Sequence, residues 1–206
     1  MKITVFGATG GTGIELVRQG LRAGHTVTAV VRSSAEFPAG VEVVRADVMD
    51  PVAIAPAVTG RDVVISALGH RPGADEPVCA PGAESIIQAM RATGTRRLVV
   101  VTAAGHVTDS QDGFLTAKVV KPLLWRFLRA AFTDFVATDS LVRASGLDWT
   151  IMRPPRLTDG GHRPYRTAID QAVRRGGTIS RTDLAAATLA AAADPATAGH
   201  TVAIAY

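Results

Sequence analysis

Three glycines near the start of the chain have the spacing of a turn that can hold a phosphate group. Gly7, Gly10 and Gly13 follow a short apolar run at 3–6 and precede apolar residues at helical spacing. Gly7 would let the chain turn sharply, Gly10 would let the backbone approach a pyrophosphate without a Cβ in the way, and Gly13 would let helix and strand pack closely. The alternative is a strand–helix turn that merely needs glycine. We predict that a dinucleotide pyrophosphate binds at this helix N-terminus. The predicted contacts are Gly7, Thr9, Gly10, Gly11, Thr12 and Gly13.

The residues after the second apolar run, 26–31, indicate which dinucleotide is bound. Sites for NAD(H) carry Asp or Glu there to bond the ribose 2′-hydroxyl, whereas this chain has Arg32 followed by Ser33. A carboxylate would repel a 2′-phosphate, but a guanidinium attracts it and can bond it bidentately, with the Ser33 hydroxyl as a further donor. The alternative is a solvated arginine after a strand. We therefore predict NADP(H), held by Arg32 and Ser33, in preference to NAD(H).

Residues that close three further predicted strands extend this site. Asp47 follows the third apolar run and could bond the adenine amine, although it could instead cap the next helix. The segment 67–69 closes the fourth strand and suits a nearby cofactor wall. Thr102 closes the fifth strand, beside the nicotinamide if the sheet is ordered as usual. The predicted cofactor site thus also includes Asp47, Ala67, Leu68, Gly69 and Thr102.

Alternating strand and helix patterns must position these residues. Apolar runs predict strands at 3–6, 26–31, 41–44, 62–65, 97–101, 149–152 and 201–205, and helical spacing predicts helices that include 81–93, 183–193 and most of 114–145. Such alternation implies βαβ crossovers. We predict one α/β domain over residues 1–206, a single Rossmann-type, doubly wound parallel sheet with helices on both faces. Residues 153–166, rich in Pro and Gly, form a predicted loop beyond a strand's carboxyl end, where open α/β sheets place substrates.

Composition and charge argue against several classes of protein. The net charge is +4, but the basic residues spread along the whole chain, which argues against nucleic-acid binding. No apolar run approaches the roughly 18 residues of a membrane span, and Lys2 is followed by too few apolar residues for a secretory signal. The single cysteine, Cys79, excludes an internal disulfide and a thiolate zinc cluster. We expect a cytoplasmic protein with no metal, no membrane partner and no nucleic-acid partner.

Six motifs spread along the chain resemble the short-chain dehydrogenase superfamily. They are VFGATGGTG at 5–13, VVRS at 30–33, ADV at 46–48, ALG at 67–69, SGLDWTIMRP at 145–154 and ISRTD at 179–183. The first is specific for the superfamily, and the last two are specific for its atypical branch of NAD(P)H-binding proteins. That branch includes the biliverdin reductase B/flavin reductase type and the NmrA-like proteins. The resemblance implies a Rossmann domain that binds NADP(H), with residues after Arg153 in the substrate pocket.

The chain departs from that superfamily at its acid–base residues. The usual Tyr-x-x-x-Lys pair is absent, because neither Tyr165 nor Tyr206 has a lysine four residues on. Ala103 stands where the flavin-reductase relatives carry serine. Arg71 matches an arginine that these relatives have after the fourth strand, and it could orient an anionic substrate or relay a proton through water. His106 could protonate near neutral pH, although a loop histidine is more often solvent-exposed. The candidate catalytic residues are Arg71, Thr102 and His106.

These residues favour an NADPH-dependent oxidoreductase that transfers a hydride to a flat conjugated acceptor, such as a flavin or a quinone. Such a small-molecule substrate needs less acid–base help than an unactivated ketone. Segments at about 106–135 and 153–180 would form the substrate side, although the aromatic and basic residues of 114–135 could instead form a dimer face or a helix packed on the sheet. The alternatives are an NADP(H)-binding sensor without turnover, as among the NmrA-like proteins, and a nucleotide-sugar-type epimerase relative. We expect a monomer or a homodimer.

Overall fold

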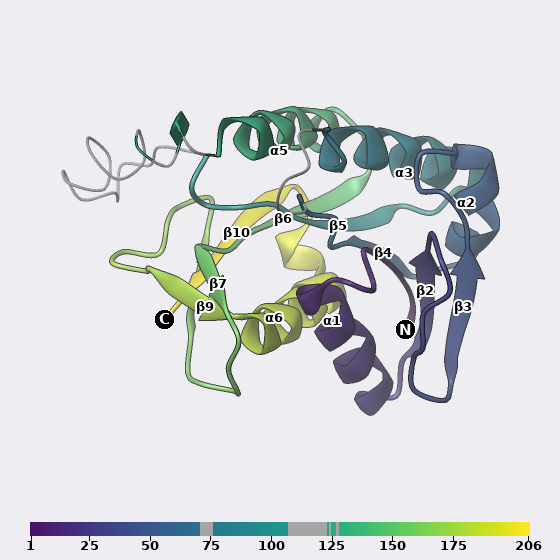
Figure 1. Ribbon diagram of the computed structural model, residues 1–206, viewed down its shortest axis with the longest axis horizontal. Helices are drawn as coiled ribbons and strands as arrows, with labels where there is room; N and C mark the ends of the chain where they lie inside the picture. The colour runs from purple at the N-terminus through teal and green to yellow at the C-terminus, as the bar shows by residue number, and fades with distance from the viewer. Residues whose placement is uncertain (71–75, 107–122, 124, 127) are drawn as a thin grey trace.

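A mostly parallel β-sheet forms the centre of the molecule. The computed structural model describes residues 1–70, 76–106, 123, 125–126 and 128–206. In this part of the chain the large sheet has the strand order β3-β2-β1-β4-β5-β6-β10-β8 (Figure 1). Its parallel strands are β1 (Lys2–Phe6), β2 (Thr26–Val31), β3 (Val41–Arg45), β4 (Val63–Ser66), β5 (Arg97–Val101), β6 (Asp148–Arg153) and β10 (His200–Ala205). The edge strand β8 (Arg166–Ile169) runs antiparallel to β10.

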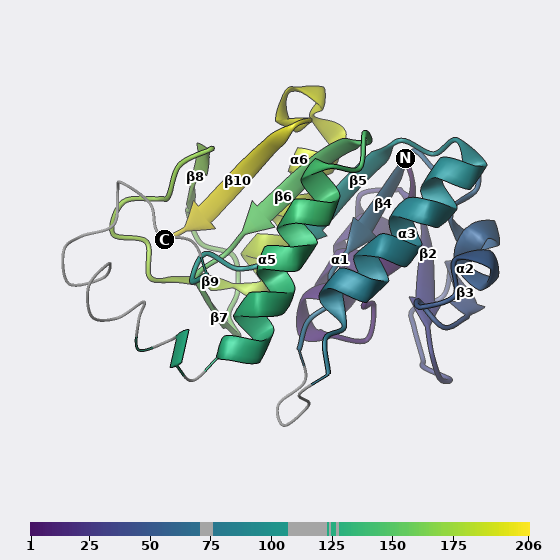
Figure 2. The same ribbon diagram turned by 90° about the horizontal axis from the view of Figure 1, so that it is seen from above.

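Helices cover both faces of this sheet. Figure 1 shows α1 (Gly11–Arg22) and α6 (Arg181–Ala193) on one face and α2 (Pro51–Val58), α3 (Cys79–Thr93) and α5 (Arg129–Arg143) on the other. Figure 2, seen from above, shows α3 and α5 side by side. Successive strand residues point to opposite faces, so Val5 packs in the core with Leu16 and Leu184, while Phe6 packs in the other core with Ile86. The predicted doubly wound α/β sheet with helices on both faces is confirmed.

The structure differs from the prediction mainly after β6. The predicted loop 153–166 contains a short strand, β7 (Arg156–Thr158), which pairs in parallel with β9 (Thr178–Ser180), outside the main sheet. Strands of only three or four residues are too short to show a detectable apolar period. Of the long helix predicted over 114–145, α5 is present, and most of residues 107–127 lie outside the described part of the chain. None of the helices in the described ranges combines the length and the apolar character needed to cross a bilayer.

The order of the strands also locates a crevice. The chain proceeds outward from β1 to β2 and β3, then returns to the other side of β1 for β4, β5 and β6. The direction of winding therefore reverses between β1 and β4. Open α/β sheets bind ligands outside the carboxyl ends of the strands at such a reversal. The segments that follow β1 and β4 are among the stretches for which the sequence predicts a cofactor site.

Candidate functional site

The glycine turn is pressed between β1, β4 and α1. Gly7 has a φ of 72°, a left-handed conformation that favours glycine, and a Cβ there would lie 2.5 Å from the carbonyl oxygen of Ala67. A Cβ on Gly13 would lie 2.1 Å from the carbonyl oxygen of Gly7. These two glycines therefore permit close backbone contacts, one between the turn and the end of β4 and one between α1 and the turn.

The N-terminus of α1 leaves backbone donors free for a ligand. The first helical bond joins the Ile14 N–H to the Gly10 carbonyl at 2.8 Å, so the N–H groups of residues 11–13 have no acceptor within the helix. Gly10, the N-cap, has no side chain to cap them. In α2, by contrast, the Asp50 carboxylate accepts from Val52 N and Ala53 N. Free N–H groups together with the helix dipole favour an anion here.

Two arginines meet beyond the ends of β2 and β3. Arg32 and Ser33 follow β2 and are exposed. Arg45, the last residue of β3, pairs in register with Val31, and its Nε donates to the Arg32 carbonyl at 3.4 Å. The prediction had not singled out Arg45, although it directly precedes the motif that contains Asp47. The Arg45 guanidinium therefore lies against the backbone of Arg32, at the end of β2, and adds a second cation to the residues at this edge of the sheet.

Asp47 lies at the same edge. Its carboxylate is exposed, and Oδ1 accepts from Met49 N at 3.0 Å. The helix cap belongs instead to Asp50, which resolves the alternative that the sequence left open for Asp47. The Asp47 carboxylate is thus not needed as the helix cap, and it is exposed at the end of β3.

The residues predicted to form the other side of the cofactor site follow β4 and β5. Ala67 N donates to the Phe6 carbonyl at 3.0 Å, which carries the segment 67–69 alongside the glycine turn. The Leu68 side chain packs against Gly82 of α3. Thr102 is buried, and its Oγ1 has no hydrogen-bond partner among the described residues. A buried hydroxyl left unpaired is costly, so this atom is available to a ligand at the carboxyl end of β5.

His106 is buried, and the expectation of a solvent-exposed loop histidine is wrong. Its Nε2 lies 2.9 Å from Oδ2 of Asp139, and the Arg153 guanidinium bonds the same carboxylate oxygen. The aromatic rings of Phe132 and Phe135 lie at centroid distances of 6.3 and 6.0 Å from the imidazole. Burial alone would raise the pKa of Asp139, but the hydrogen bond from His106 and the charge of Arg153 hold it below its usual value.

The other candidate catalytic residues are placed only in part. The structure brings Thr102, His106, Asp139 and Arg153 to the carboxyl-end region of β5 and β6. Arg71 lies outside the described residues. Asp139 was missed by sequence reasoning, and the available signal was an acidic residue on the buried face of an amphipathic helix.

A second group of polar side chains has the spacing of a metal site. It consists of His70, Cys79 and Asp134, and one ligand atom of each lies within 4.8 Å of the others. Asp134 is already engaged, because its carboxylate accepts from the backbone N–H groups of Val78, Cys79 and Ala80. Burial and the nearby carboxylate raise the pKa of the Cys79 thiol far above its usual value, and this thiol donates to the Leu68 carbonyl at 3.5 Å. We interpret the group as the cap of α3.

Comparisons with known proteins agree with this geometry. The family model described as NAD(P)H-binding matches residues 7–195. A crystal structure from Burkholderia pseudomallei, of a protein described as a candidate exported protein, is 31% identical, covers 100% of both chains and has a TM-score of 0.82. A candidate NADH-flavin reductase from Streptococcus pneumoniae is 24% identical over 100% of this chain and 99% of its own, with a TM-score of 0.81, which shows a shared fold.

The similarity to curated proteins extends over fewer residues of the chain. An uncharacterised Mycobacterium tuberculosis protein is 35% identical over 107 residues, which are 52% of this chain and 12% of that relative. The chain thus spans a small part of the first relatives that it matches. The family match, in contrast, extends from the glycine turn almost to β10. The uncapped N-terminus of α1 and the Thr102 hydroxyl, which has no partner in the described part of the chain, fit a dinucleotide. The protein therefore belongs to the NAD(P)H-binding family, with the oxidoreductase-like Rossmann fold and a site for a nicotinamide cofactor.

Proposed function

We propose that the protein is an NADPH-dependent oxidoreductase that transfers a hydride to a flat conjugated acceptor of the flavin or quinone kind. The observation that carries the choice of cofactor is the exposed Arg32 directly after β2, with the Arg45 side chain of β3 bonded to its carbonyl, at the same edge of the sheet as the glycine turn. The name of the pneumococcal neighbour, a candidate NADH-flavin reductase, supports the acceptor class.

Each part of the site has a distinct binding task in this proposal. The free N–H groups of residues 11–13 bind the pyrophosphate, Arg32, Ser33 and Arg45 bind the 2′-phosphate, and Asp47 accepts from the adenine amine. The segment 67–69 and Thr102 border the nicotinamide. When bound, the reduced nicotinamide supplies the hydride. The full set of proposed cofactor contacts is Gly7, Thr9, Gly10, Gly11, Thr12, Gly13, Arg32, Ser33, Arg45, Asp47, Ala67, Leu68, Gly69 and Thr102.

On the substrate side the chain orients the acceptor and excludes water. The imidazole of His106 is buried and tied to Asp139, so its role is to hold the loop after β5 in place. The Thr102 hydroxyl, which has no partner in the described structure, donates to the nicotinamide or to the acceptor. Arg71 supplies a positive field. Negative charge that develops on an acceptor heteroatom is protonated by water, because the chain has no Tyr-x-x-x-Lys pair.

Cofactor preference tests the first half of the proposal. Arg32→Ala should weaken NADPH binding about ten- to a hundredfold, because one charge-assisted hydrogen bond is worth roughly 1.5–3 kcal/mol, and should leave NADH binding nearly unchanged. Titration of both cofactors by calorimetry measures this. Arg18→Ala is the matched control, since Arg18 is a surface arginine of α1 paired with Glu15. Equal affinities of the native protein for NADPH and NADH would contradict the assignment.

Turnover tests the second half. NADPH oxidation is followed with flavin mononucleotide, menadione and benzaldehyde as acceptors. We expect oxidation with the flavin or the quinone and little with the aldehyde. The rival function is an NADP(H)-binding sensor, which the missing Tyr-x-x-x-Lys pair favours. Tight NADPH binding without oxidation by any of the three acceptors would support the sensor.

We expect the protein to act in the cytoplasm, as the buried free cysteine Cys79 suits a reducing compartment.

Thr102→Val tests whether the hydroxyl beyond β5 is a dedicated proton donor. The substitution preserves the shape of the side chain and removes a buried hydroxyl without a described partner, so stability should not fall. Single-turnover loss of NADPH absorbance should slow about tenfold or less, since the hydroxyl only assists. A general acid would contribute about 10²–10⁴-fold, so a thousandfold loss would show that Thr102 is the donor.

A further inference from the structure

The side chain of Arg181 crosses the face of the glycine turn. Arg181 is the first residue of α6, and α6 packs beside α1. A Cβ built on Gly11 would lie 2.5 Å from Cδ and 2.8 Å from Nε of Arg181. The absence of a side chain on Gly11 therefore makes room for the arginine stem. The guanidinium is thereby brought to the uncapped first turn of α1, where the family binds its cofactor.

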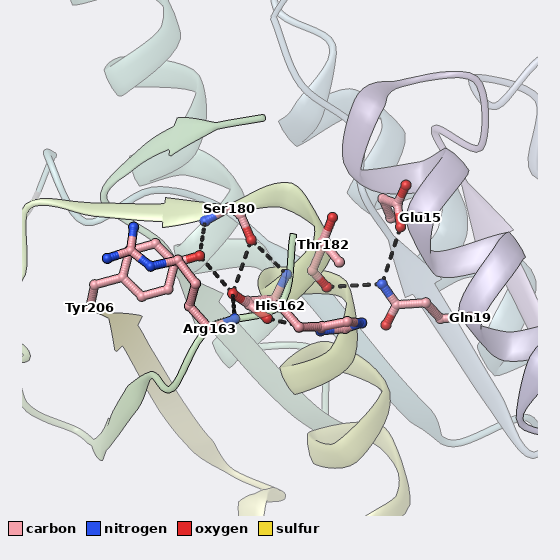
Figure 3. Close-up of polar contacts among 8 residues, drawn as sticks. Glu15, Gln19, His162, Arg163, Ser180, Thr182 and Tyr206 are labelled. Carbon is pink, nitrogen blue, oxygen red and sulfur yellow. Dashed lines mark hydrogen bonds and ion pairs between the residues drawn. The ribbon is translucent and has the colours of Figure 1, made fainter. Parts of the chain in front are cut away.

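The backbone on either side of Arg181 is anchored to the rest of the fold (Figure 3). Ser180 caps α6, since its Oγ accepts from Asp183 N at 3.0 Å. The Thr182 carbonyl accepts from Nε2 of Gln19 on α1 at 2.9 Å. These bonds fix the start of α6 relative to α1. The fold thus fixes the backbone position from which the Arg181 side chain reaches the turn.

A buried carboxylate completes this anchor. The Asp183 side chain accepts from the Tyr206 hydroxyl at 2.6 Å and from the Ser180 hydroxyl at 3.1 Å, and His162 contacts its other oxygen at 3.0 Å. Burial would raise the pKa of Asp183, but these hydrogen bonds and one from the Arg163 backbone hold it below its usual value. Asp183 is therefore ionised at neutral pH and ties α6 to the end of the chain and to the segment before β8.

In this structure Arg181 makes an exposed ion pair with Asp159, which another anion can readily replace. Its Nη1 lies 2.5 Å from Oδ1 of Asp159, whose side chain is 90% exposed. Ion pairs of this exposure contribute little to stability, because water and salt screen them. A pyrophosphate offers more charge and a fork of oxygens that matches the planar guanidinium.

We propose that Arg181 is a second contact for the cofactor pyrophosphate, from α6 instead of α1, and that Asp159 is the counter-ion that it leaves when the cofactor binds. Asp159 lies between β7 and β8, in the segment expected to border the substrate. Cofactor binding therefore frees a residue of that segment, which couples the two parts of the site. The inference depends on the family's nicotinamide cofactor and is independent of the proposed acceptor and of turnover.

Calorimetric titration with NADPH and with NADH tests the contact. Arg181→Ala should weaken both cofactors about ten- to a hundredfold and by the same factor, since the pyrophosphate is common to both. Arg32→Ala should change only the NADPH value. Arg181→Lys, which keeps an aliphatic stem over Gly11 and a charge, should recover part of the loss. Arg163→Ala is the matched control, because the Arg163 side chain stacks on the Tyr206 ring at 4.5 Å and its bond to Asp183 is made by the backbone N–H, which the substitution keeps. Unchanged or tighter binding by Arg181→Ala would overturn it.

Asp159→Asn tests the exchange of partners. Loss of the competing carboxylate should tighten both cofactors up to about fivefold, because the pair that must break is worth at most about that factor. Thermal unfolding of each variant without cofactor checks that the start of α6 is intact. Weaker or unchanged cofactor binding by Asp159→Asn would show that the Asp159–Arg181 pair does not compete with the pyrophosphate, and would overturn this part of the proposal.

Discussion

Gly10→Val should abolish binding of both NADPH and NADH while leaving the fold intact. Gly10 has a φ of −76° and a ψ of 160°, an extended conformation that valine adopts readily. Apart from its two chain neighbours, a Cβ there would meet one atom of the described residues within 4 Å, the Gly7 carbonyl oxygen at 3.3 Å, so that backbone needs to give by only a few tenths of an ångström. The branched side chain would instead fill the space in front of the free N–H groups of α1. Circular dichroism and cofactor titration measure the two effects separately.

Gly13→Ala provides the contrasting control on the same turn. A Cβ on Gly13 would lie 2.1 Å from the Gly7 carbonyl oxygen and 2.8 Å from Cα of Ala8, and these backbone atoms cannot move aside without separating α1 from β1. We expect this variant to lose stability, and to lose cofactor binding as a consequence. A Gly10→Val protein that binds NADPH with native affinity would show that the pyrophosphate lies elsewhere.

The parts of the site predicted from the sequence are those encoded by adjacent residues. The glycine turn, the sheet and the segments after β1, β2 and β4 all follow from short runs in which strand, turn and helix are consecutive. Apolar runs such as 97–101 also identify strands buried on both faces, because the helices that cover them leave no solvent-facing side. Local pattern therefore sufficed for the fold class and for where a cofactor site should lie.

The parts of the site that were not predicted from the sequence depend on contacts between residues far apart in the chain. His106 and Asp139 are 33 residues apart, and nothing near His106 in the sequence indicates that α5 supplies its partner. The contact of Arg181 with Gly11 likewise requires α6 to pack beside α1, although both residues lie within recognised motifs. Because of such tertiary contacts His106 is buried, although a histidine in a loop is expected to be exposed.

Asp139→Ala should destabilise the protein by about 3–5 kcal/mol, because it leaves the Arg153 guanidinium and the His106 imidazole without their shared partner in a buried site. For a domain of this size we expect Tm to fall by roughly 6–20 °C. Asp148→Ala is the matched control. It removes the partner of Arg96 in a pair whose side chains are 62% and 48% exposed, and it should leave the stability nearly unchanged because water and salt screen the pair. Similar losses in the two variants would contradict the inference that burial makes the Asp139 cluster important.

The difference in stability between the native protein and Asp139→Ala should also depend on pH in a defined direction. The pKa of Asp139 is lower in the folded protein than in the unfolded chain, where it is about 3.9. The contribution of the carboxylate is therefore fully present above that value and is lost as the pH falls through the lower, folded pKa. Urea unfolding should show the full difference in free energy of unfolding between the native protein and Asp139→Ala at pH 5, and a smaller difference below about pH 4. If the difference were the same at pH 3 as at pH 5, Asp139 would stabilise the loop after β5 by packing alone, and the charge that orients His106 would have no part in holding the substrate side together.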